Sequence, residues 1–360
     1  MRVAVVGAGI NGIMSAWALA NDGHGVALFE RGMPMDATSS ASSKLLHGGL
    51  RYLEHGEFRL VREGLRERAW WIDAAPHHAR PLELVLPVYR GAGRSRLTLK
   101  LGLLAYDLLA GRRRLGWHRW QDAPALLSAV PELRDERLRG GYRFVDGQMD
   151  DRALGLWALA RAVAGGVQLR PQTPVDRIDR DGGVTAGGSR EAYDCVVNAA
   201  GPWAEDLLRR SGIPARHRLD LVRGSHLVID RPLKRGFLLQ SPDDARVCFV
   251  LPWQGRTLVG TTEVRQALSE PVECSAVERG YLLNLWNAHF RTPVGAADVV
   301  EAFAGLRPLV AGVADDPRAI TRDYAIECCG RVVTVFGGKW TTARALGRRV
   351  AAEVGRVVAG

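Results

Sequence analysis

Cysteine is scarce in this sequence, and long apolar runs are missing. The five cysteines among 360 residues are scattered and show neither C-x-x-C pairs nor the Cys/His spacing of a metal site. An odd, scattered set is typical of free thiols in a reducing compartment, so we expect a cytoplasmic protein without a metal. No run of about 18 uncharged apolar residues exists, and glycines interrupt the apolar start of the chain, so we expect neither a membrane span nor a signal peptide.

Acidic residues are also in short supply. The sequence has 39 Asp and Glu against 49 Lys and Arg, which gives a net charge of +10. This excess favours an acidic partner such as nucleic acid, an anionic membrane surface or a phosphorylated small molecule, although an unspecialised basic surface gives the same count. With 47% hydrophobic residues, the chain is long enough for two globular domains.

The segment near the N-terminus has the pattern of a dinucleotide-binding site. An apolar run typical of a buried parallel strand leads into Gly7, Gly9 and Gly12, and a helical pattern and a second strand follow before Glu30. Gly7 makes the tight turn, Gly9 lets the backbone approach a pyrophosphate, and Gly12 lets the helix pack on the strand. Glu30 is placed to accept hydrogen bonds from a ribose, which disfavours NADP and leaves NAD and FAD open.

Later segments indicate a second, mostly antiparallel domain. The stretches RLDLVRGSHLVIDR, GFLLQ, RVCFVLPW and RTLVGTTEV read as strands joined by turns. Another apolar strand, over residues 195–197, runs into small residues at 199–201. These leave room for a ligand at the strand's carboxyl end, or they simply let strand and helix pack.

The stretch SSKLLHGGLRYLE, residues 42–54, mixes features that core segments keep apart. Serines and Lys44 follow the second strand and fit the phosphate or flavin side of a dinucleotide. Gly48 and Gly49 precede Arg51, which stands among apolar residues. The charges of the following helix are interpreted as a solvated face.

Further cations stand in comparable loop settings. The C-terminal stretch VFGGKWTTARALG places a glycine pair and Lys339 at a helix N-terminus, where backbone N–H groups can approach an electron-rich ring. FAGLRPLV and ITRDYAIE add Arg307 and Arg322. Any one such arginine is ordinarily a salt-bridge partner, but together with Arg51 these cations favour an anion site.

The segment RSRLTLKLGLLAYDLLAGRRRLGWHRW resembles an interfacial anchor. Leucines at 97, 101, 104 and 108 share one helical face, and Arg112–Arg114, Trp117 and Trp120 follow. Basic and aromatic residues beside an apolar face suit lipid headgroups, whereas a buried helix with a basic cap is the other interpretation. We therefore expect a peripheral location on the inner face of the cell membrane as one possibility for this cytoplasmic protein.

Together these motifs closely resemble the flavin-dependent glycerol-3-phosphate dehydrogenases, within the wider family of D-amino-acid-oxidase-like flavoproteins. The matching segments run in order from GAGINGIMSAWALA to GGKWTTARALG, and SSKLLHGGLRYLE is the most specific of them. The resemblance implies FAD as cofactor and oxidation of sn-glycerol 3-phosphate, or a closely similar phosphorylated alcohol, to dihydroxyacetone phosphate by hydride transfer to the flavin N5. Electrons would pass to a quinone or another acceptor, nucleic acid is not an expected partner, and a homodimer is left open.

The expected fold is α/β and α+β, with a Rossmann-like FAD-binding domain and an interleaved, mainly antiparallel-sheet substrate domain. The FAD-binding domain is expected to comprise residues 1–78, 140–215 and 320–360, and the substrate domain residues 79–139 and 216–319. Family members typically continue into a separate C-terminal helical domain, whereas this sequence stops at Gly360, so we expect a short form without that domain.

The resemblance also implies roles for single residues. His226 is the candidate base for the C2 hydroxyl proton, with a satisfied strand histidine as the alternative. Arg307 and Lys339 are expected to act in catalysis, with Lys339 stabilising charge on the carbonyl oxygen or the reduced flavin, and Thr262 is expected to form a polar wall. The residues expected to surround the substrate are Arg51, Thr262, Arg307, Arg322 and Lys339. The expected FAD contacts are Gly7, Gly9, Ile10, Asn11, Gly12, Glu30, Arg31, Thr38, Ser39, Ser43, Lys44, Leu45, His47, Gly49, Val175, Ala199, Gly201, Trp203, Gly338, Lys339, Trp340 and Thr341.

Two other functions remain compatible with these residues. One is an FAD-dependent oxidase of another small anionic hydroxy or amino acid that uses oxygen. The other is a flavin-binding interaction protein without turnover, against which the presence of Arg51, His226 and Lys339 speaks. His47 is interpreted as a non-covalent flavin contact.

Overall fold

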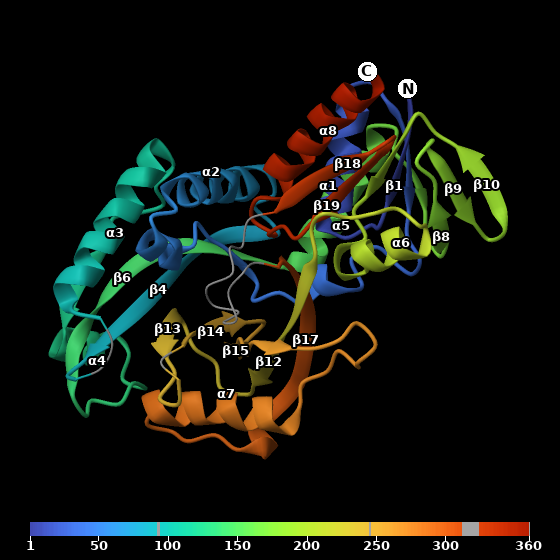
Figure 1. Cartoon of the computed structure of the whole chain (residues 1–360). Helices are drawn as coiled ribbons and strands as arrows, with labels where there is room; N and C mark the ends of the chain where they lie inside the picture. Colours follow the sequence, from blue (N-terminus) through green and yellow to red (C-terminus); the bar gives the residue numbers. More distant parts are fainter. Residues whose placement is uncertain (92–93, 245, 312–323, 360) are drawn as a thin grey trace.

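A computed structural model describes residues 1–91, 94–244, 246–311 and 324–359 and shows two large sheets and a small third sheet within one chain (Figure 1). The first sheet has six strands in the order β18-β19-β11-β1-β2-β7, all parallel except β18. Its four inner strands are short, largely apolar runs, as expected for strands buried on both faces. The six strands are β1 (Arg2–Val6), β2 (Gly25–Phe29), β7 (Gln168–Arg170), β11 (Cys195–Asn198), β18 (Ala325–Cys329) and β19 (Val332–Phe336).

Both faces of this parallel sheet are covered. One face packs against α1 (Ile10–Asn21), α5 (Asp151–Ala164) and α8 (Ala343–Ala359). The other face packs against α6 (Ala204–Arg210) and a small antiparallel sheet. That small sheet consists of β8 (Val175–Ile178), β9 (Gly183–Ala186) and β10 (Ser189–Ala192).

Glycines set how closely α1 can approach its neighbours. A Cβ atom at Gly12 would lie 1.8 Å from the carbonyl oxygen of Gly7, so α1 packs directly on the turn that follows β1. A Cβ atom at Gly347 would lie 2.4 Å from the carbonyl oxygen of Met14, where α8 crosses α1. The role predicted for Gly12 in helix–strand packing is therefore confirmed.

The second sheet is mainly antiparallel and has ten strands. Its main path runs β16-β12-β15-β14-β13-β4-β6-β3, with β17 paired to β12 and β5 paired to β6; only the β13–β4 pair is parallel. The strands are β3 (Leu45–Leu46), β4 (Ala79–Tyr89), β5 (Arg119–Asp122), β6 (Leu138–Met149), β12 (Leu219–Ile229), β13 (Gly236–Gln240), β14 (Val247–Trp253), β15 (Arg256–Gly260), β16 (Val264–Arg265) and β17 (Val299–Val310). The mixed α/β architecture with a separate antiparallel sheet confirms the expected fold class.

Helices cover the second sheet unevenly. One apolar cluster joins it to α4 (Ala123–Ala129) and α7 (Ala276–His289), and another joins it to α3 (Arg96–Ala110), which packs in turn on α2 (Phe58–Ala74). Short 3-10 turns complete the chain: η1 (Thr38–Ser40), η2 (Leu50–His55), η3 (Gly111–Arg113), η4 (Gly201–Trp203) and η5 (Ala296–Asp298). Over the described ranges, no helix combines the length and the apolar character needed to cross a bilayer.

The expected domain boundary at residue 140 falls inside a strand. β6 pairs with β4 along its whole length, from Leu138 opposite Tyr89 to Met149 opposite Ala79. Residues 140–149 thus belong to the antiparallel sheet and not to the dinucleotide-binding part. The other expected boundaries remain predictions, and the one at 319/320 lies outside the described residues.

Candidate active site

A cavity of about 760 Å³ lies where the two sheets meet. Loops at the carboxyl ends of β1, β2 and β11 line one part of it, the edge at which doubly wound α/β folds bind ligands. Residues of β12, β14 and β17 line another part. The volume lies in the range of cofactor and ligand sites.

The turn after β1 requires glycine. Gly7 has φ of +100°, and a Cβ atom there would lie 2.7 Å from the carbonyl oxygen of Ala199. At the end of β2, the Glu30 carboxylate accepts hydrogen bonds from the N–H of Ala8 at 2.7 Å and from that of Gly32 at 3.0 Å. These bonds fix the carboxylate at the cavity wall, with lone pairs left for a ligand hydroxyl.

The N-terminus of α1 is tied to two distant loops. The N–H of Ile10 donates to Ser39 Oγ at 3.0 Å, and Trp340 Nε1 donates to the Ser39 carbonyl at 2.9 Å. Asn11 Nδ2 donates to the carbonyl of Gly337 at 3.1 Å, while Asn11 Oδ1 is buried without a hydrogen-bond partner among the described atoms. All of these residues line the cavity, so the helix N-terminus, the η1 turn and the glycine loop before α8 form one wall.

A cation–π stack forms the wall near η4. The Arg31 guanidinium lies 3.6 Å from the centroid of the Trp203 ring, and both side chains line the cavity. Such stacking holds the guanidinium flat against an aromatic face. The stack therefore provides a fixed surface close to Glu30, the neighbour of Arg31 in the chain.

The stretch with the paired glycines forms the wall next to α2. Gly49 has φ of +79°, and a Cβ atom at Gly48 would lie 2.6 Å from the Leu65 side chain. The chain can pass α2 at this point only without a side chain at Gly48. Arg51 follows in η2 and lines the cavity, as does Lys339, whose Nζ lies 4.0 Å from the centroid of the Tyr52 ring.

A buried polar cluster holds this glycine pair. The N–H of Gly48 donates to the Tyr106 hydroxyl at 2.7 Å, and that hydroxyl donates to Asp146 Oδ2 at 2.8 Å. Arg68 Nη1 donates to Asp146 Oδ1 at 2.8 Å and neutralises the carboxylate. A buried network of this kind favours one geometry, because breaking any of these bonds leaves another buried polar group unpaired.

His226 is buried within the sheet yet reaches the cavity. Its ring is 1% exposed, stacks on Phe303 with ring centroids 5.0 Å apart, and places Nε2 at 2.9 Å from Ser43 Oγ. Burial, and then the charges of Arg307 and Lys44, hold the pKa of His226 well below its usual range. The imidazole is therefore neutral at physiological pH, and its Nδ1 has no hydrogen-bond partner among the described residues.

The position of His226 depends on a glycine across the ladder. Gly260 of β15 lies directly opposite His226, and a Cβ atom at Gly260 would lie 2.1 Å from His226 Cδ2. The imidazole therefore occupies the space that any other residue at 260 would fill. The GTTE motif thus contributes to the site through the absence of a side chain as well as through its threonines.

Arg307 lies across the backbone of β12 in front of the cavity. Its Nη2 donates to Thr261 Oγ1 at 2.5 Å, and its Nη1 lies 3.7 Å from Glu263 Oε1. A Cβ atom at Gly224 would lie 2.0 Å from Nη2, so the guanidinium rests directly on the glycine. Arg307 is thus held with a fixed orientation at the cavity wall, 23% exposed.

Most of the residues predicted from the sequence line this cavity. Every predicted substrate or cofactor contact does so except Gly12, Lys44, Thr262 and Arg322. Gly12 supports the helix packing described above, and Arg322 lies outside the described residues. The cavity therefore brings together residues from position 7 to position 341.

Lys44 and Thr262 do not line the cavity, and their predicted ligand contacts stay predictions. Lys44 Nζ donates to Asp151 Oδ1 and to the Ser40 carbonyl, both at 2.7 Å, so it closes a loop instead of lining the cavity. Thr262 is 2% exposed and its hydroxyl donates to Glu278; the neighbouring Thr261 lines the cavity in its place. Successive side chains of an extended segment point to opposite sides, which explains the exchange.

Sequence reasoning missed several polar residues at the cavity, among them Thr261, Glu263 and Arg246. Thr261 and Glu263 flank Thr262 in the GTTE motif, and Arg246 begins the stretch RVCFVLPW. The GTTE motif was recognised, but its register in the sheet could not be known. Arg246 pairs with Asp244 at 3.0 Å, so it also reads as an ordinary salt-bridge partner.

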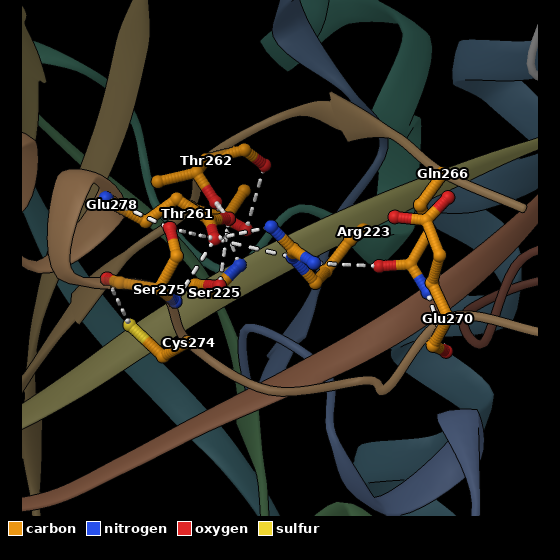
Figure 2. A network of polar contacts seen from close by, with 9 residues as sticks. All are labelled: Arg223, Ser225, Thr261, Thr262, Gln266, Glu270, Cys274, Ser275 and Glu278. Atoms are coloured by element: carbon orange, nitrogen blue, oxygen red, sulfur yellow. Dashed lines mark hydrogen bonds and ion pairs between the residues drawn. The ribbon is translucent and has the colours of Figure 1, made fainter.

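A second network lies behind this wall, on the side of α7 (Figure 2). The Glu278 carboxylate accepts hydrogen bonds from Thr262 Oγ1 at 2.6 Å, Ser225 Oγ at 2.8 Å and Arg223 Nη2 at 2.8 Å. It also completes a capping box with Ser275 at the start of α7. One carboxylate thus joins α7, β12 and the GTTE segment, directly behind His226 and Thr261.

Comparison with known proteins identifies the family. A family model described as FAD dependent oxidoreductase (DAO) matches residues 2–353. The chain therefore belongs to the family of DAO-type FAD-dependent oxidoreductases, and FAD is its cofactor.

The chain is also similar to individual, named members of this family. The chain is 38% identical to a glycerol-3-phosphate dehydrogenase of Pseudomonas aeruginosa over 96% of its own length and 69% of the relative. It is 35% identical to the D-erythritol 1-phosphate dehydrogenase of Brucella abortus, over 96% of its own length and 72% of the relative. A solved glycerol-3-phosphate dehydrogenase from Bacillus halodurans, complexed with FAD, superposes with a TM-score of 0.79 at 26% identity, covering 99% of this chain and 64% of that one. The chain thus spans about two thirds of the length of these relatives.

The residues present fit FAD. Glycine is required at Gly7 and at Gly338, where a Cβ atom would lie 2.4 Å from Asn11 Nδ2, so the backbone forms a cradle that side chains would fill. Glu30 offers an acceptor for a ribose, and the N-terminus of α1 offers N–H groups to a pyrophosphate. Asn11 Oδ1 is buried at the wall formed with the glycine loop and has no hydrogen-bond partner among the described atoms. A hydrogen-bond donor on a bound ligand would satisfy it.

The Glu278 network predicts a dependence of stability on pH. Burial raises the pKa of Glu278, but hydrogen bonds from Thr262, Ser225, Ser275 and Arg223 outweigh it and lower the pKa to about 2 from 4.5. A lowered pKa means that the contribution to stability is present above pH 4.5 and is lost as the pH falls towards 2. Glu278→Gln is expected to unfold at lower urea concentration than the parent at pH 7, with a difference that shrinks progressively below pH 4.5.

The free energy of unfolding, measured by urea titration across this pH range, checks the prediction. Glu278→Ala is expected to cost about 3–5 kcal/mol at pH 7, because Arg223 is left buried without its partner. Glu353→Gln removes a half-buried carboxylate that pairs with the exposed Arg356 and serves as the control, with an expected change within about 0.5 kcal/mol. A difference between parent and Glu278→Gln that is independent of pH would contradict the assignment.

Proposed function

We propose that the protein oxidises a small phosphorylated alcohol, sn-glycerol 3-phosphate or a close analogue, at the cavity between its two sheets. The observation that carries this proposal is the juxtaposition of a buried neutral imidazole, His226, with the fixed guanidinium of Arg307. Relatives named for glycerol 3-phosphate and for D-erythritol 1-phosphate support an alcohol that carries a phosphate. The product from sn-glycerol 3-phosphate is dihydroxyacetone phosphate.

His226 is the base in this proposal. FAD, when bound, supplies the two-electron acceptor for the reaction. A neutral imidazole can accept the proton of the substrate hydroxyl, and we assign this role to Nε2, the nitrogen on the Ser43 side. Stacking on Phe303 and contact with Gly260 keep the ring in one orientation, so little reorganisation is needed.

The cations of the cavity provide the counter-charge for the phosphate. Arg307 cannot rotate freely, because Thr261 and Glu263 hold it and Gly224 lies under it. Arg51 and Lys339 line the same cavity, and guanidinium forks suit a phosphate dianion. Lys339 is proposed to stabilise charge at the reacting oxygen, and Arg322 is proposed as a further phosphate ligand on the basis of the sequence motif.

Anaerobic reduction of the bound flavin tests this function. Addition of sn-glycerol 3-phosphate to the FAD-loaded protein is expected to bleach the absorbance near roughly 450 nm. His226→Gln is expected to slow the bleaching by about 10²–10⁴-fold, since a general base contributes that much. His289→Gln is the matched control, because His289 is also buried but bonds to the Gln240 carbonyl away from the cavity.

The same screen separates the alternatives. D-erythritol 1-phosphate is included as a second phosphorylated alcohol, and small hydroxy and amino acids as unphosphorylated anions. Bleaching by the unphosphorylated compounds alone would replace the proposal with an oxidase of another small anion. A flavin that none of these compounds bleaches would indicate an interaction protein without turnover.

We further propose that α3 contacts a membrane surface, where a quinone would be the electron acceptor. Leu97, Leu101 and Leu108 are 65%, 58% and 61% exposed on one side of α3, whereas Leu103 and Tyr106 are buried on the other. The predicted leucine face is therefore present and points to solvent. Arginines of η3 follow it directly, as in helices that lie in the headgroup region of a bilayer.

Replacing exposed leucines tests the membrane contact. Leu101→Asp combined with Leu108→Asp is expected to weaken co-sedimentation with phosphatidylglycerol-containing vesicles by at least about tenfold, because apolar area no longer enters the bilayer. Val277→Asp changes an 82% exposed residue of α7 in the same way and should have no effect. Equal binding of the parent and the double variant would refute a role for α3.

A further inference from the structure

A second, smaller cavity lies between α2, η3 and α8. It shares no lining residue with the cavity between the two large sheets, which is called the flavin cavity below. It has a volume of about 380 Å³. Residues of the three elements line it, although they are far apart in the sequence. They are Arg66, Ala69, Trp70 and Asp73 of α2, Arg113 of η3, and Arg344 and Arg348 of α8.

Positive charge dominates this small cavity. Four guanidinium groups line it against one carboxylate, that of Asp73. Arg344 and Arg348 are four residues apart on α8, and like charges at this spacing repel one another. Arg66 and Arg113 approach from two other elements, so the repulsion is not an accident of one helix. An anion in the cavity would relieve it.

Neighbouring carboxylates do not balance these charges. Glu67 is fully buried and is used by Arg344, whose Nε and Nη2 donate to its two oxygens at 2.7 and 3.0 Å, and by Arg66 at 3.3 Å. Arg113 and Arg348 form no ion pair with any described residue. Two guanidinium groups at the cavity are thus available to a ligand.

The remaining walls combine a guanidinium of fixed orientation with apolar surface. The Arg344 guanidinium lies 4.2 Å from the centroid of the Trp70 ring, so the bidentate pair with Glu67 and the stack together fix its plane. Guanidinium forks bind phosphate oxygens in pairs, whereas Trp70 and Ala69 offer apolar surface beside them. The volume admits one such group and is half that of the flavin cavity.

We propose that this cavity, named here the arginine pocket, binds the anion of a phosphate ester. Arg113 and Arg348 are its unpaired cations and Arg344 is its pre-oriented one. Both a soluble phosphate ester and a phospholipid headgroup carry this chemistry. Arg113 follows α3 by three residues, so the pocket lies next to the exposed leucine face in the chain. The site does not depend on the oxidation proposed above, because no residue is common to the two.

Paired binding measurements on the FAD-loaded protein test the arginine pocket. One arm measures co-sedimentation with vesicles that contain phosphatidylglycerol, and the other measures the rise in melting temperature caused by inorganic phosphate. Arg113→Gln and Arg348→Gln are each expected to weaken the affinity by about fivefold in at least one arm. Phosphate that binds in the flavin cavity contributes equally to all variants and cancels in the comparison.

The control is Arg112→Gln, which removes the same charge from the same turn without touching the pocket lining. A loss confined to vesicle binding supports the pocket with a lipid headgroup as its ligand, and a loss confined to the phosphate response supports a soluble ester. If Arg113→Gln and Arg348→Gln behave like Arg112→Gln in both arms, general surface charge explains the binding and the pocket is refuted. Neither arm requires turnover, so failure of the proposed oxidation would leave this result intact.

Discussion

The burial of one imidazole next to one guanidinium is the interaction on which the site depends. His226 loses water on entering the sheet, and Arg307 adds a positive charge beside it, so both effects oppose protonation. A neutral base is thereby kept in a cavity lined by cations. Burying these two polar side chains side by side costs free energy. The arrangement is possible because Gly260 and Gly224 leave space for the side chains and Thr261 holds the guanidinium. Function thus rests on small residues as much as on charged ones.

The two large sheets provide different parts of the cavity. The parallel sheet presents glycine turns and Glu30 at its carboxyl edge, where the residues fit a dinucleotide. The antiparallel sheet presents His226 and Arg307 from adjacent strands, β12 and β17, so that the proposed base and the proposed anion ligand keep a fixed separation. Behind them, Glu278 ties the same strand to α7, which stiffens the wall from its far side.

Features set by neighbouring residues could be predicted from the sequence, whereas features set by contacts between distant residues could not. The turn at Gly7 and the exposed leucines of α3 follow from spacing alone, because each is set within one helix or one turn. The pairing of Lys44 with Asp151 could not be predicted, because the two residues lie 107 positions apart in the chain. Thr262 was chosen over Thr261 because the side to which a strand residue points depends on pairing, here with β12. Residue 140 was taken as a boundary because nothing in the sequence shows that β6 continues the pairing with β4.

The pH dependence of anaerobic flavin reduction tests the state of His226 most directly. With its pKa held well below the usual value of 6.5, the base stays neutral as the pH falls through that value. The limiting rate of reduction by sn-glycerol 3-phosphate is therefore expected to stay constant from about pH 8 to about pH 5.5. A limiting rate that falls about tenfold per pH unit below 6.5 in the parent but not in His226→Gln would contradict a neutral buried base, because the substrate phosphate, with its second pKa of about 6, titrates equally in both.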